Sequence, residues 1–430
     1  MNNGFINQMT DFREWLIYNQ AGDKMIYVLA FFVIMAMIGV FVTKKYRIPI
    51  VVAYVFLGII LSVDLISRLP FFSMEFKEWY AFTVENFGFT SHLALGFIAF
   101  TAGSELSLRT LKRLGKSIVY ITILQALGAF LIVFLGVSLL GYPSYMALIL
   151  GAIATATNPA ATVMVFKEYR AEGLVSSMIM AVVAIGDAVA LLIFSLIKPI
   201  AQIQTGEGAF RLKEVLLIPA IEIVASLALG ILIGYFSQKI IVNADDKTKK
   251  ILIIISTIIG AIALSMFFHL SPLITNMAVG FAYRNFARKN LGIAEYMDTM
   301  TIPIYAIFFI LAGTGINFSS IASLSFLALA SVFFLTRISG KIFGSCLGAF
   351  MAKSPDKVKK YVGLGLFSHS GVAIALAYTV QREFVAVPAT GMLIFNILLL
   401  TAALTEVLGP FATKYAIMKA GESRELMNRD

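Results

Sequence analysis

The chain has 430 residues, of which 59% are hydrophobic and only 13% are charged, and its formal net charge is +10. This apolar content exceeds what a soluble core can bury, and it predicts a polytopic membrane protein. The lysines and arginines are spread over short loops between apolar segments, which indicates membrane topology and contact with anionic lipid headgroups rather than nucleic-acid binding.

The apolar segments predict an all-α membrane protein with about thirteen transmembrane helices, separated by charged residues or by Gly and Pro. The N-terminal residues lack the pattern of a cleavable signal peptide, so we expect the first span to direct the chain into the membrane. In chain order the expected spans are 25–43, 48–66, 92–106, 117–140, 143–166, 173–197, 214–238, 250–268, 271–285, 300–316, 321–352, 360–380 and 388–414.

The charged loops predict the orientation of these spans. One side of the predicted membrane holds 24 Lys and Arg, in the segments 44–47, 109–116, 167–170, 238–250, 284–290, 353–360 and the C-terminal tail, whereas the other side holds 8. By the positive-inside rule the basic side is cytoplasmic. We therefore expect the N-terminus outside the cell (inner) membrane and the C-terminus in the cytoplasm.

Several classes of chemistry have no support in the sequence. There is no Walker motif and no Cys/His metal cluster, so we expect neither ATP hydrolysis nor enzymatic activity, and no cofactor beyond a transported ion. Cys346 is the single cysteine, which excludes an intrachain disulfide.

The fifth predicted helix contains a polar interruption, "ATATNPAATV" at 154–163. Pro159 has no N–H group, so the carbonyl of Thr155 loses its helical partner, and Thr157 and Asn158 add polar groups at membrane depth. These residues predict a broken helix. The alternative is a simple proline kink, which only bends the span.

The sixth predicted helix carries a carboxylate, Asp187, near its middle. A charge at that depth is costly unless it is protonated, paired or exposed to a cavity, so an intramembrane acid indicates a proton or ion site. Such a group can hold a proton and exchange it for a cation. The alternative is a structural Asp in a helix–helix hydrogen bond.

Two later helices contain further polar groups. Arg337 and Lys341 lie four residues apart in the eleventh helix and therefore share a face. They either snorkel to the membrane surface, oppose the dipole ends of broken helices, or pair with a carboxylate. The twelfth helix has a flexible polar stretch that contains Ser368, His369 and Ser370, where His369 is either a buried structural histidine or a proton-handling group.

These features repeat along the chain. The interruptions at 157–159 and 368–371 are about 210 residues, or seven helices, apart, and Asp187 and Asn396 have the same spacing. An odd number of spans relates two halves by inverted topology, so we expect two crossed broken helices that form an ion site near the membrane midplane, as in secondary transporters.

At these residues the sequence resembles the monovalent cation/proton antiporters, in particular the second cation/proton antiporter family of the Na⁺/H⁺ exchanger superfamily. The resemblance spans about 25–415, and its most recognisable pieces are "GFIAFTAGSEL" (96–106), "ATATNPAATVMVFKEYRAEG" (154–173), "AVVAIGDAVALLIF" (181–194), "IFFILAGTGINF" (307–318), "TRISGKIFGSCLGA" (336–349) and "FSHSGVAIALA" (367–377).

The resemblance implies a homodimer in which each chain has a mobile core and a dimerisation subdomain within 25–415. An extracytoplasmic segment, 1–24, and a cytoplasmic tail, 416–430, flank this domain. It also implies that Asp187 binds the cation and that Thr157 and Asn158 lie in the unwound segment beside it. The sequence departs from the family at Gly186, where members often carry Asp or Asn.

We therefore expect an antiporter that exchanges Na⁺ or K⁺ for H⁺ and contributes to pH homeostasis. Because Gly186 cannot titrate, we expect electroneutral 1:1 exchange, with Lys341, His369 and Glu105 as the groups able to supply a second proton. The alternatives are an organic-anion symporter of the same fold, or a channel or sensor derived from it.

Overall fold

A computed structural model of the chain describes residues 30–41, 43, 50–70, 72–86, 88–109, 112, 115–158, 162, 165–166, 169–206, 217–244, 246–287, 293–315, 323–369 and 371–423. These residues form an all-helical fold in which the described segments contain no β-strand and one isolated bridge, between Ala171 and Ser423. Residues 30–41 are helical, and the later helices are α2 (Ile50–Ile60), α3 (Val63–Arg68), α4 (Met74–Asn86), α5 (Gly88–Glu105), α7 (Lys116–Leu139), α8 (Ser144–Ala154), α10 (Leu174–Gln204), α11 (Ile218–Val242), α12 (Lys247–Phe267), α13 (Pro272–Phe286), α14 (Ile293–Thr314), α16 (Leu324–Met351), α17 (Asp356–Tyr361), the 3₁₀-helix η2 (Val362–Leu366), α18 (Gly371–Glu383) and α19 (Pro388–Ala420).

The helices confirm the predicted fold class. Among the described helices, six are long and apolar enough to cross a membrane: α7, α10, most of α11, α12, α16 and α19. The segments Asp356–Leu366 and Gly371–Glu383 are together long and apolar enough for a further span, and they are bent by 47° relative to each other at a break. Shorter apolar helices cover 30–41, 92–104, 144–154 and 303–314.

Several helices are longer than the sequence predicted. α10 continues past the predicted end at 197, through Pro199, to Gln204, and α19 continues past the predicted end at 414 to Ala420. Proline is tolerated inside membrane helices because neighbouring groups satisfy the freed backbone. The polar helix α4 was not predicted, because its charged residues lower its hydropathy below that of a membrane span.

The chain divides into two compact units. The smaller unit comprises Met1–Thr90 and Pro303–Ile316. Within it α2 and the second half of α14 pack closely at two glycines, since a Cβ added to Gly58 would lie 2.8 Å from the Cα of Gly313. The larger unit comprises Ser91–Ile302 and Asn317–Asp430.

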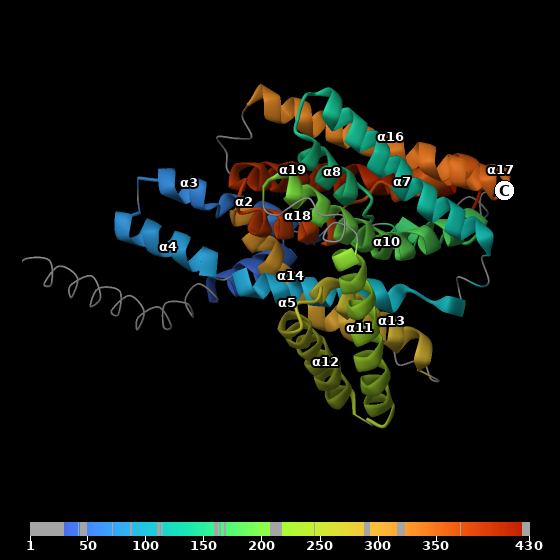
Figure 1. Ribbon diagram of the computed structural model, residues 1–430, viewed down its shortest axis with the longest axis horizontal. Helices are drawn as coiled ribbons and strands as arrows, with labels where there is room; N and C mark the ends of the chain where they lie inside the picture. Colours follow the sequence, from blue (N-terminus) through green and yellow to red (C-terminus); the bar gives the residue numbers. More distant parts are fainter. Residues whose placement is uncertain are drawn as a thin grey trace, which may run out of the picture. The chain divides into compact units, whose positions relative to one another are not determined.

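In the larger unit α7 and α16 lie side by side along most of their lengths (Figure 1). Three glycines spaced four residues apart on α16 make this approach possible: Gly340, Gly344 and Gly348 face the backbone of α7, where a Cβ on Gly348 would lie 2.6 Å from the Cα of Ile121. Small residues at this spacing allow membrane helices to pack backbone to backbone. This packing fixes the face of α16 that carries Arg337 and Lys341.

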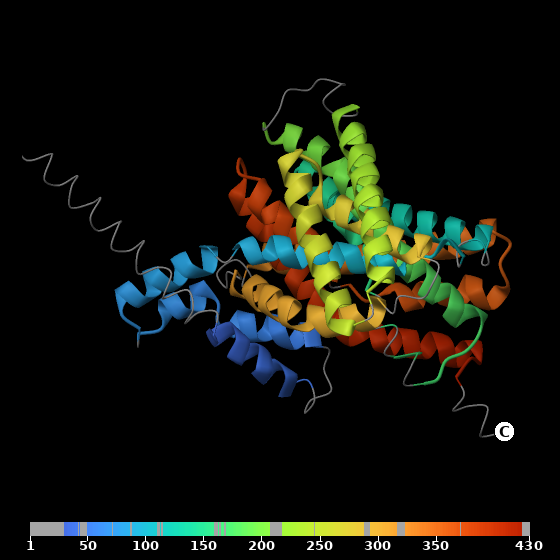
Figure 2. The same ribbon diagram turned by 90° about the horizontal axis from the view of Figure 1, so that it is seen from below.

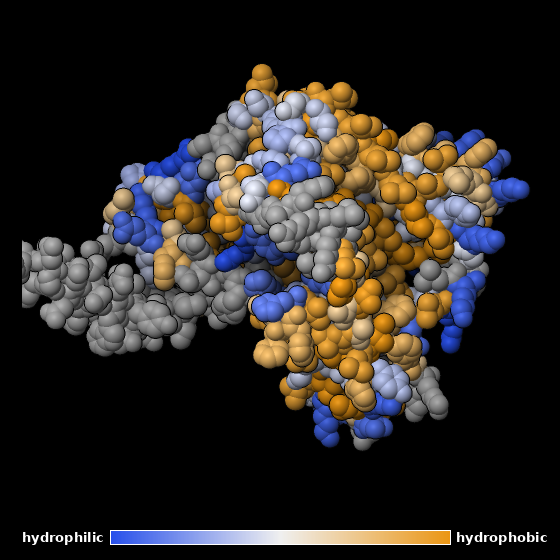
Figure 3. All heavy atoms as spheres, in the orientation of Figure 1, coloured by the Kyte–Doolittle hydropathy of each residue, from blue (hydrophilic) through white to orange (hydrophobic). Residues whose placement is uncertain are grey.

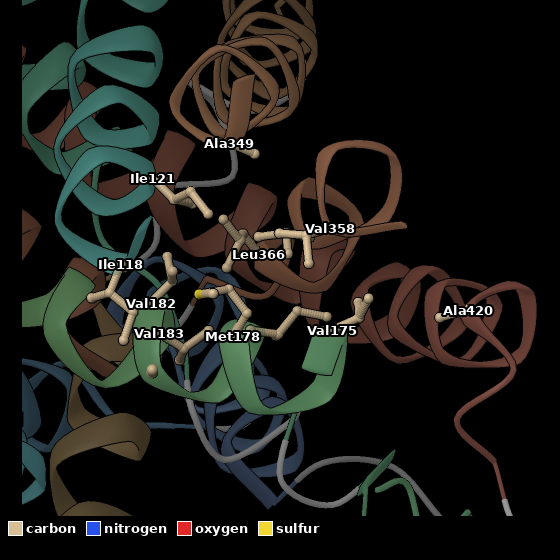
Figure 4. Packing of buried hydrophobic residues seen from close by; sticks show 13 residues of the cluster. Ile118, Ile121, Val175, Met178, Val182, Val183, Ala349, Val358, Leu366 and Ala420 are labelled. Atoms are coloured by element: carbon tan, nitrogen blue, oxygen red, sulfur yellow. The ribbon is translucent and has the colours of Figure 1, made fainter. Parts of the chain in front are cut away.

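Around this pair, a hydrophobic cluster joins α7, α10, α16, α17, η2 and α19 (Figure 4). Its members include Ile118 and Ile121 from α7, Val182 from α10 and Leu366 from η2. A second group of helices in the same unit is formed by α11, α12 and α13, which contact one another (Figure 2, yellow-green to gold).

The outer surface of the helices in the larger unit is apolar, as α7 and α16 illustrate. Leu135 on α7 is 56% exposed and Phe350 on α16 is 68% exposed. Figure 3 shows apolar side chains covering much of the visible face of these helices. Such a surface is stable against lipid and would aggregate in water, which agrees with a multi-pass membrane protein.

Candidate functional site

The predicted break in the fifth helix is confirmed. α8 ends at Ala154, and residues 156–158 are not helical. Thr155, the last residue in a helical conformation, turns its hydroxyl back to the carbonyl of Ala152 at 2.7 Å. Pro159, the predicted cause of the break, lies outside the described residues. Four consecutive residues of the break, Thr155 to Asn158, are buried, so their backbone groups need protein partners.

The second predicted break, in the twelfth helix, is also confirmed. η2 ends at Leu366 and α18 begins at Gly371, and residues 367–369 between them are not helical. Ser368 and His369 are buried, whereas Ser370 lies outside the described residues. Each of the two broken helices therefore has backbone carbonyl groups inside the larger unit that accept no hydrogen bond from a helical amide.

Asp187 lies on α10 directly beside the first break. Its side chain is buried, and its Oδ1 accepts hydrogen bonds from the Thr157 amide at 3.0 Å and from the Thr157 hydroxyl at 3.4 Å. The same hydroxyl donates to the Val183 carbonyl at 3.2 Å, which ties the break to α10. Within the described residues both hydrogen bonds to the carboxylate end on Oδ1, which leaves Oδ2 for a proton or a cation.

Arg337 binds the carbonyl ends of both broken helices. Its Nη1 donates to the Phe367 carbonyl at 2.7 Å, and its Nη2 donates to the Ala156 carbonyl at 3.0 Å and to that of Ser368 at 3.3 Å. The carbonyl end of a helix carries partial negative charge, which a cation stabilises. Arg337 is 1% exposed and does not snorkel.

Lys341, one turn further along α16, opposes the end of α8. Its Nζ donates to the Thr155 carbonyl at 3.1 Å, the carbonyl that Pro159 cannot satisfy. It also donates to Oε1 of Gln125 on α7 at 3.2 Å. Of the alternatives for the two cations, the geometry favours opposition to the dipole ends of the broken helices.

His369, at the second break, contacts α8, the helix that ends at the first break. The Ile153 carbonyl lies 3.2 Å from its Nε2, and a carbonyl only accepts, so Nε2 carries the hydrogen. Nδ1 is buried and has no hydrogen-bond partner among the described residues. This contact is what a buried structural histidine makes, and its part in proton handling stays a prediction.

The space beside Gly186 is occupied by Thr157. A Cβ on residue 186 would lie 2.8 Å from Thr157 Oγ1 and 3.7 Å from Nε2 of Gln125. That Nε2 has no partner within the described part of the chain. Gln125 was not singled out from the sequence, although a lone amide in an apolar span is a signal of the same kind as Asp187.

A second buried carboxylate, Glu406, completes the site. It lies on α19 and is 2% exposed, and its Oε1 accepts a hydrogen bond from Asn158 Nδ2 at 2.7 Å. Glu406 was not predicted from the sequence, although an isolated acid within the span 388–414 meets the criterion that identified Asp187.

Two other predicted residues have no hydrogen bond to the site among the described residues. Glu105 is the last residue of α5, and its side chain lies outside the described residues. Asn396, the repeat counterpart of Asp187, is fully buried on α19, and neither polar atom of its side chain has a hydrogen-bond partner among the described residues.

The site thus combines two broken helices, two buried cations and two buried carboxylates. Arg337 is close enough to interact electrostatically with both Asp187 and Glu406. With all four groups ionised, their charges cancel. A monovalent cation or a proton added at Asp187 gives the same net charge, so the two ions can replace each other at one carboxylate.

The chain is similar to a known family of membrane transporters and to a solved transporter structure. Residues 29–419 match the family model described as "Sodium/hydrogen exchanger, transmembrane". Among solved structures, the chain is similar to the sodium proton antiporter MjNhaP1 from Methanocaldococcus jannaschii, with a TM-score of 0.72 and 18% identity over 93% of this chain and 99% of that one. No curated protein sequence matches the chain.

Proposed function

The chain belongs to the sodium/hydrogen exchanger family, and on this premise we propose that it exchanges Na⁺ or K⁺ for H⁺ through Asp187. Membership of the family supports cation/proton antiport by a multi-pass membrane protein that is a transporter rather than an enzyme. The observation that supports the site is the buried Asp187 carboxylate, held through Oδ1 by Thr157 at the broken helix.

In the proposed cycle one carboxylate carries two ions in turn. Asp187 binds the cation through its free oxygen, with Thr157 and Asn158 of the unwound segment completing the site. Unwound backbone at membrane depth is where secondary transporters bind coupling ions. A proton then displaces the cation, and the reverse exchange occurs on the other side of the membrane.

We propose that this exchange is electroneutral, with one proton moved for one cation. The site has the same net charge whether Asp187 holds a proton or a cation. Arg337 is a constant charge because arginine keeps its proton in proteins. Gly186 provides no second acid at the position beside Asp187.

The assembly and location are part of the same proposal. The protein acts as a homodimer in a cell membrane, with a mobile core and a dimerisation subdomain, an extracytoplasmic N-terminal segment and a cytoplasmic C-terminus. The strong Lys/Arg bias between the two sides supports this orientation.

The decisive test is proton flux in proteoliposomes, with Na⁺, K⁺ and Li⁺ offered one at a time. We expect Asp187→Asn to abolish cation-dependent proton flux while the protein still purifies as folded dimer, since a neutral isostere of a buried acid is tolerated. Glu222→Gln is the matched control, because Glu222 is a partly buried carboxylate of α11 outside the site. Substantial flux in Asp187→Asn contradicts the mechanism.

Stoichiometry is tested by imposing a membrane potential on the same liposomes. Electroneutral exchange predicts initial rates that do not depend on the potential. A reversal potential that fits two protons per cation shows a second titrating group and overturns the 1:1 cycle.

A further inference from the structure

Glu406 is a buried carboxylate that the proposed exchange at Asp187 does not use. It lies in the middle of the apolar helix α19 and is 2% exposed. An acid at membrane depth is costly to bury and is retained where it has a specific partner. The partner here is the amide of Asn158 in the first broken helix.

The helix that carries Glu406 is held in register with the second break. Thr405 donates from its hydroxyl to the His369 carbonyl at 3.4 Å. Gly409 lies so close to Ser368 that a Cβ would be 3.1 Å from the Ser368 amide nitrogen. These contacts on either side of Glu406 hold its segment of α19 against the second break, and from this position the carboxylate contacts Asn158.

The contact between Glu406 and Asn158 determines which way the Asn158 amide faces. An ionised carboxylate only accepts hydrogen bonds, so the NH₂ group of Asn158 faces Glu406, as the 2.7 Å contact from Nδ2 to Oε1 requires. The amide oxygen therefore points away from Glu406. That oxygen is the atom of the side chain able to coordinate a cation, and a flipped amide would present hydrogens to the ion instead.

Glu406 also balances charge at the crossing of the broken helices. Arg337 interacts electrostatically with Glu406 and with Asp187, and its guanidinium is held by the Phe367, Ala156 and Ser368 carbonyls. Without Glu406, the buried Arg337 and Lys341 would face Asp187 as the single carboxylate of this group. A net positive site repels the transported cation.

We propose that Glu406 is a positioning residue that orients Asn158 and thereby sets the affinity for the transported cation, without carrying a proton through the cycle. This inference rests on the proposed function. In this proposal α19 contributes to cation affinity through the charge-assisted hydrogen bond between Glu406 and Asn158.

The test is a double-mutant cycle on cation-dependent proton flux, with the cation that supports wild-type exchange. Glu406→Gln has the same shape but offers either an oxygen or an NH₂ group, so it no longer enforces the amide orientation. We expect the KM for the cation to rise about tenfold, with the maximal rate within about twofold of wild type. In the Asn158→Ala background, Glu406→Gln should raise KM by much less than it does alone, because only the lost charge still acts there.

Two controls separate this effect from loss of a charge or of folding. Glu222→Gln removes a partly buried carboxylate outside the site and should leave KM unchanged. If Glu406→Gln does not purify as folded protein, Glu406→Asp replaces it. Glu406→Asp keeps the charge but is one methylene too short to hold Asn158, so a rise in KM is expected here without any contribution from a lost charge.

Three results overturn the inference. They are an unchanged KM in Glu406→Gln, a KM effect that adds fully to that of Asn158→Ala, or a change in reversal potential in Glu406→Gln, which would make Glu406 a proton carrier. Normal wild-type exchange with any of these outcomes refutes the role of Glu406 alone. Absence of cation-dependent flux in wild type and in Glu222→Gln refutes the proposed function itself, and the role of Glu406 with it.

Discussion

The N-terminus of α10, the helix that carries Asp187, is capped by a residue from the far end of the chain. Gly173 precedes the helix and offers no side chain. The Glu422 carboxylate takes that place, accepting from the amides of Val175 at 2.8 Å and Ser176 at 2.7 Å and from the Ser176 hydroxyl at 2.7 Å. We predict that Glu422→Ala loosens the first turn of α10.

The expected cost follows from the groups left without a partner. Two buried amides lose a charged acceptor, each such hydrogen bond contributing about 1.5–3 kcal/mol, and the negative charge at the positive end of the helix adds about 0.3–1 kcal/mol. Glu422 is 8% exposed, so water replaces part of the loss. We expect a net cost of about 3 kcal/mol, or roughly a hundredfold increase in local opening.

Hydrogen–deuterium exchange of the protein in nanodiscs measures this opening directly. Peptides that cover 171–178 should lose roughly a hundredfold in protection in Glu422→Ala, while peptides from α12 should not change. Asp356→Asn is the control, because its ion pair with Lys359 is exposed and should not affect exchange. Gly173→Asp added to Glu422→Ala should restore part of the protection by supplying a conventional N-cap.

An unchanged exchange rate over 171–178 in Glu422→Ala would refute the capping role. A uniform loss of protection over all of α10 would also refute it, because the argument confines the effect to the first turn. Failure of Gly173→Asp to recover any protection would show that the amides of Val175 and Ser176 are not the groups that matter.

Two further predictions concern the broken helix. Asn158→Ala and Thr157→Ala should each raise the KM for the cation several-fold and change the maximal rate less, since both remove oxygen atoms from the site. Unchanged KM values in both variants would show that the segment acts as a hinge and does not bind the cation. Gly186→Ala should also raise KM, because its Cβ would lie 2.8 Å from the Thr157 hydroxyl that bonds Asp187. Gly260→Ala is the control, since no atom outside the nearby backbone of its own helix lies within 4 Å of the added Cβ. Equal effects of the two glycine substitutions on transport would contradict the close packing.

The all-helical membrane fold and the two breaks were predictable from the sequence because both depend on local chemistry. An apolar segment partitions into lipid residue by residue, and Pro159 removes a backbone donor whatever surrounds it. The depth of Asp187 in an apolar span was equally visible. The end of α10 was not, because the helix continues through Pro199, and hydropathy does not contain the neighbouring groups that make a proline tolerable inside a membrane helix.

The partners of the buried polar groups were decided by tertiary structure alone. The pair Asn158–Glu406 joins residues 248 positions apart, and Arg337 reaches the carbonyl of Ala156 across 181 positions. Such contacts depend on how the helices cross. The glycines of α16 set the crossing only when α7 packs against them. The sequence by itself therefore determined which groups are too polar for the membrane, and the fold decided which of them meet, because a buried charge is stabilised by whatever partner the packing places beside it.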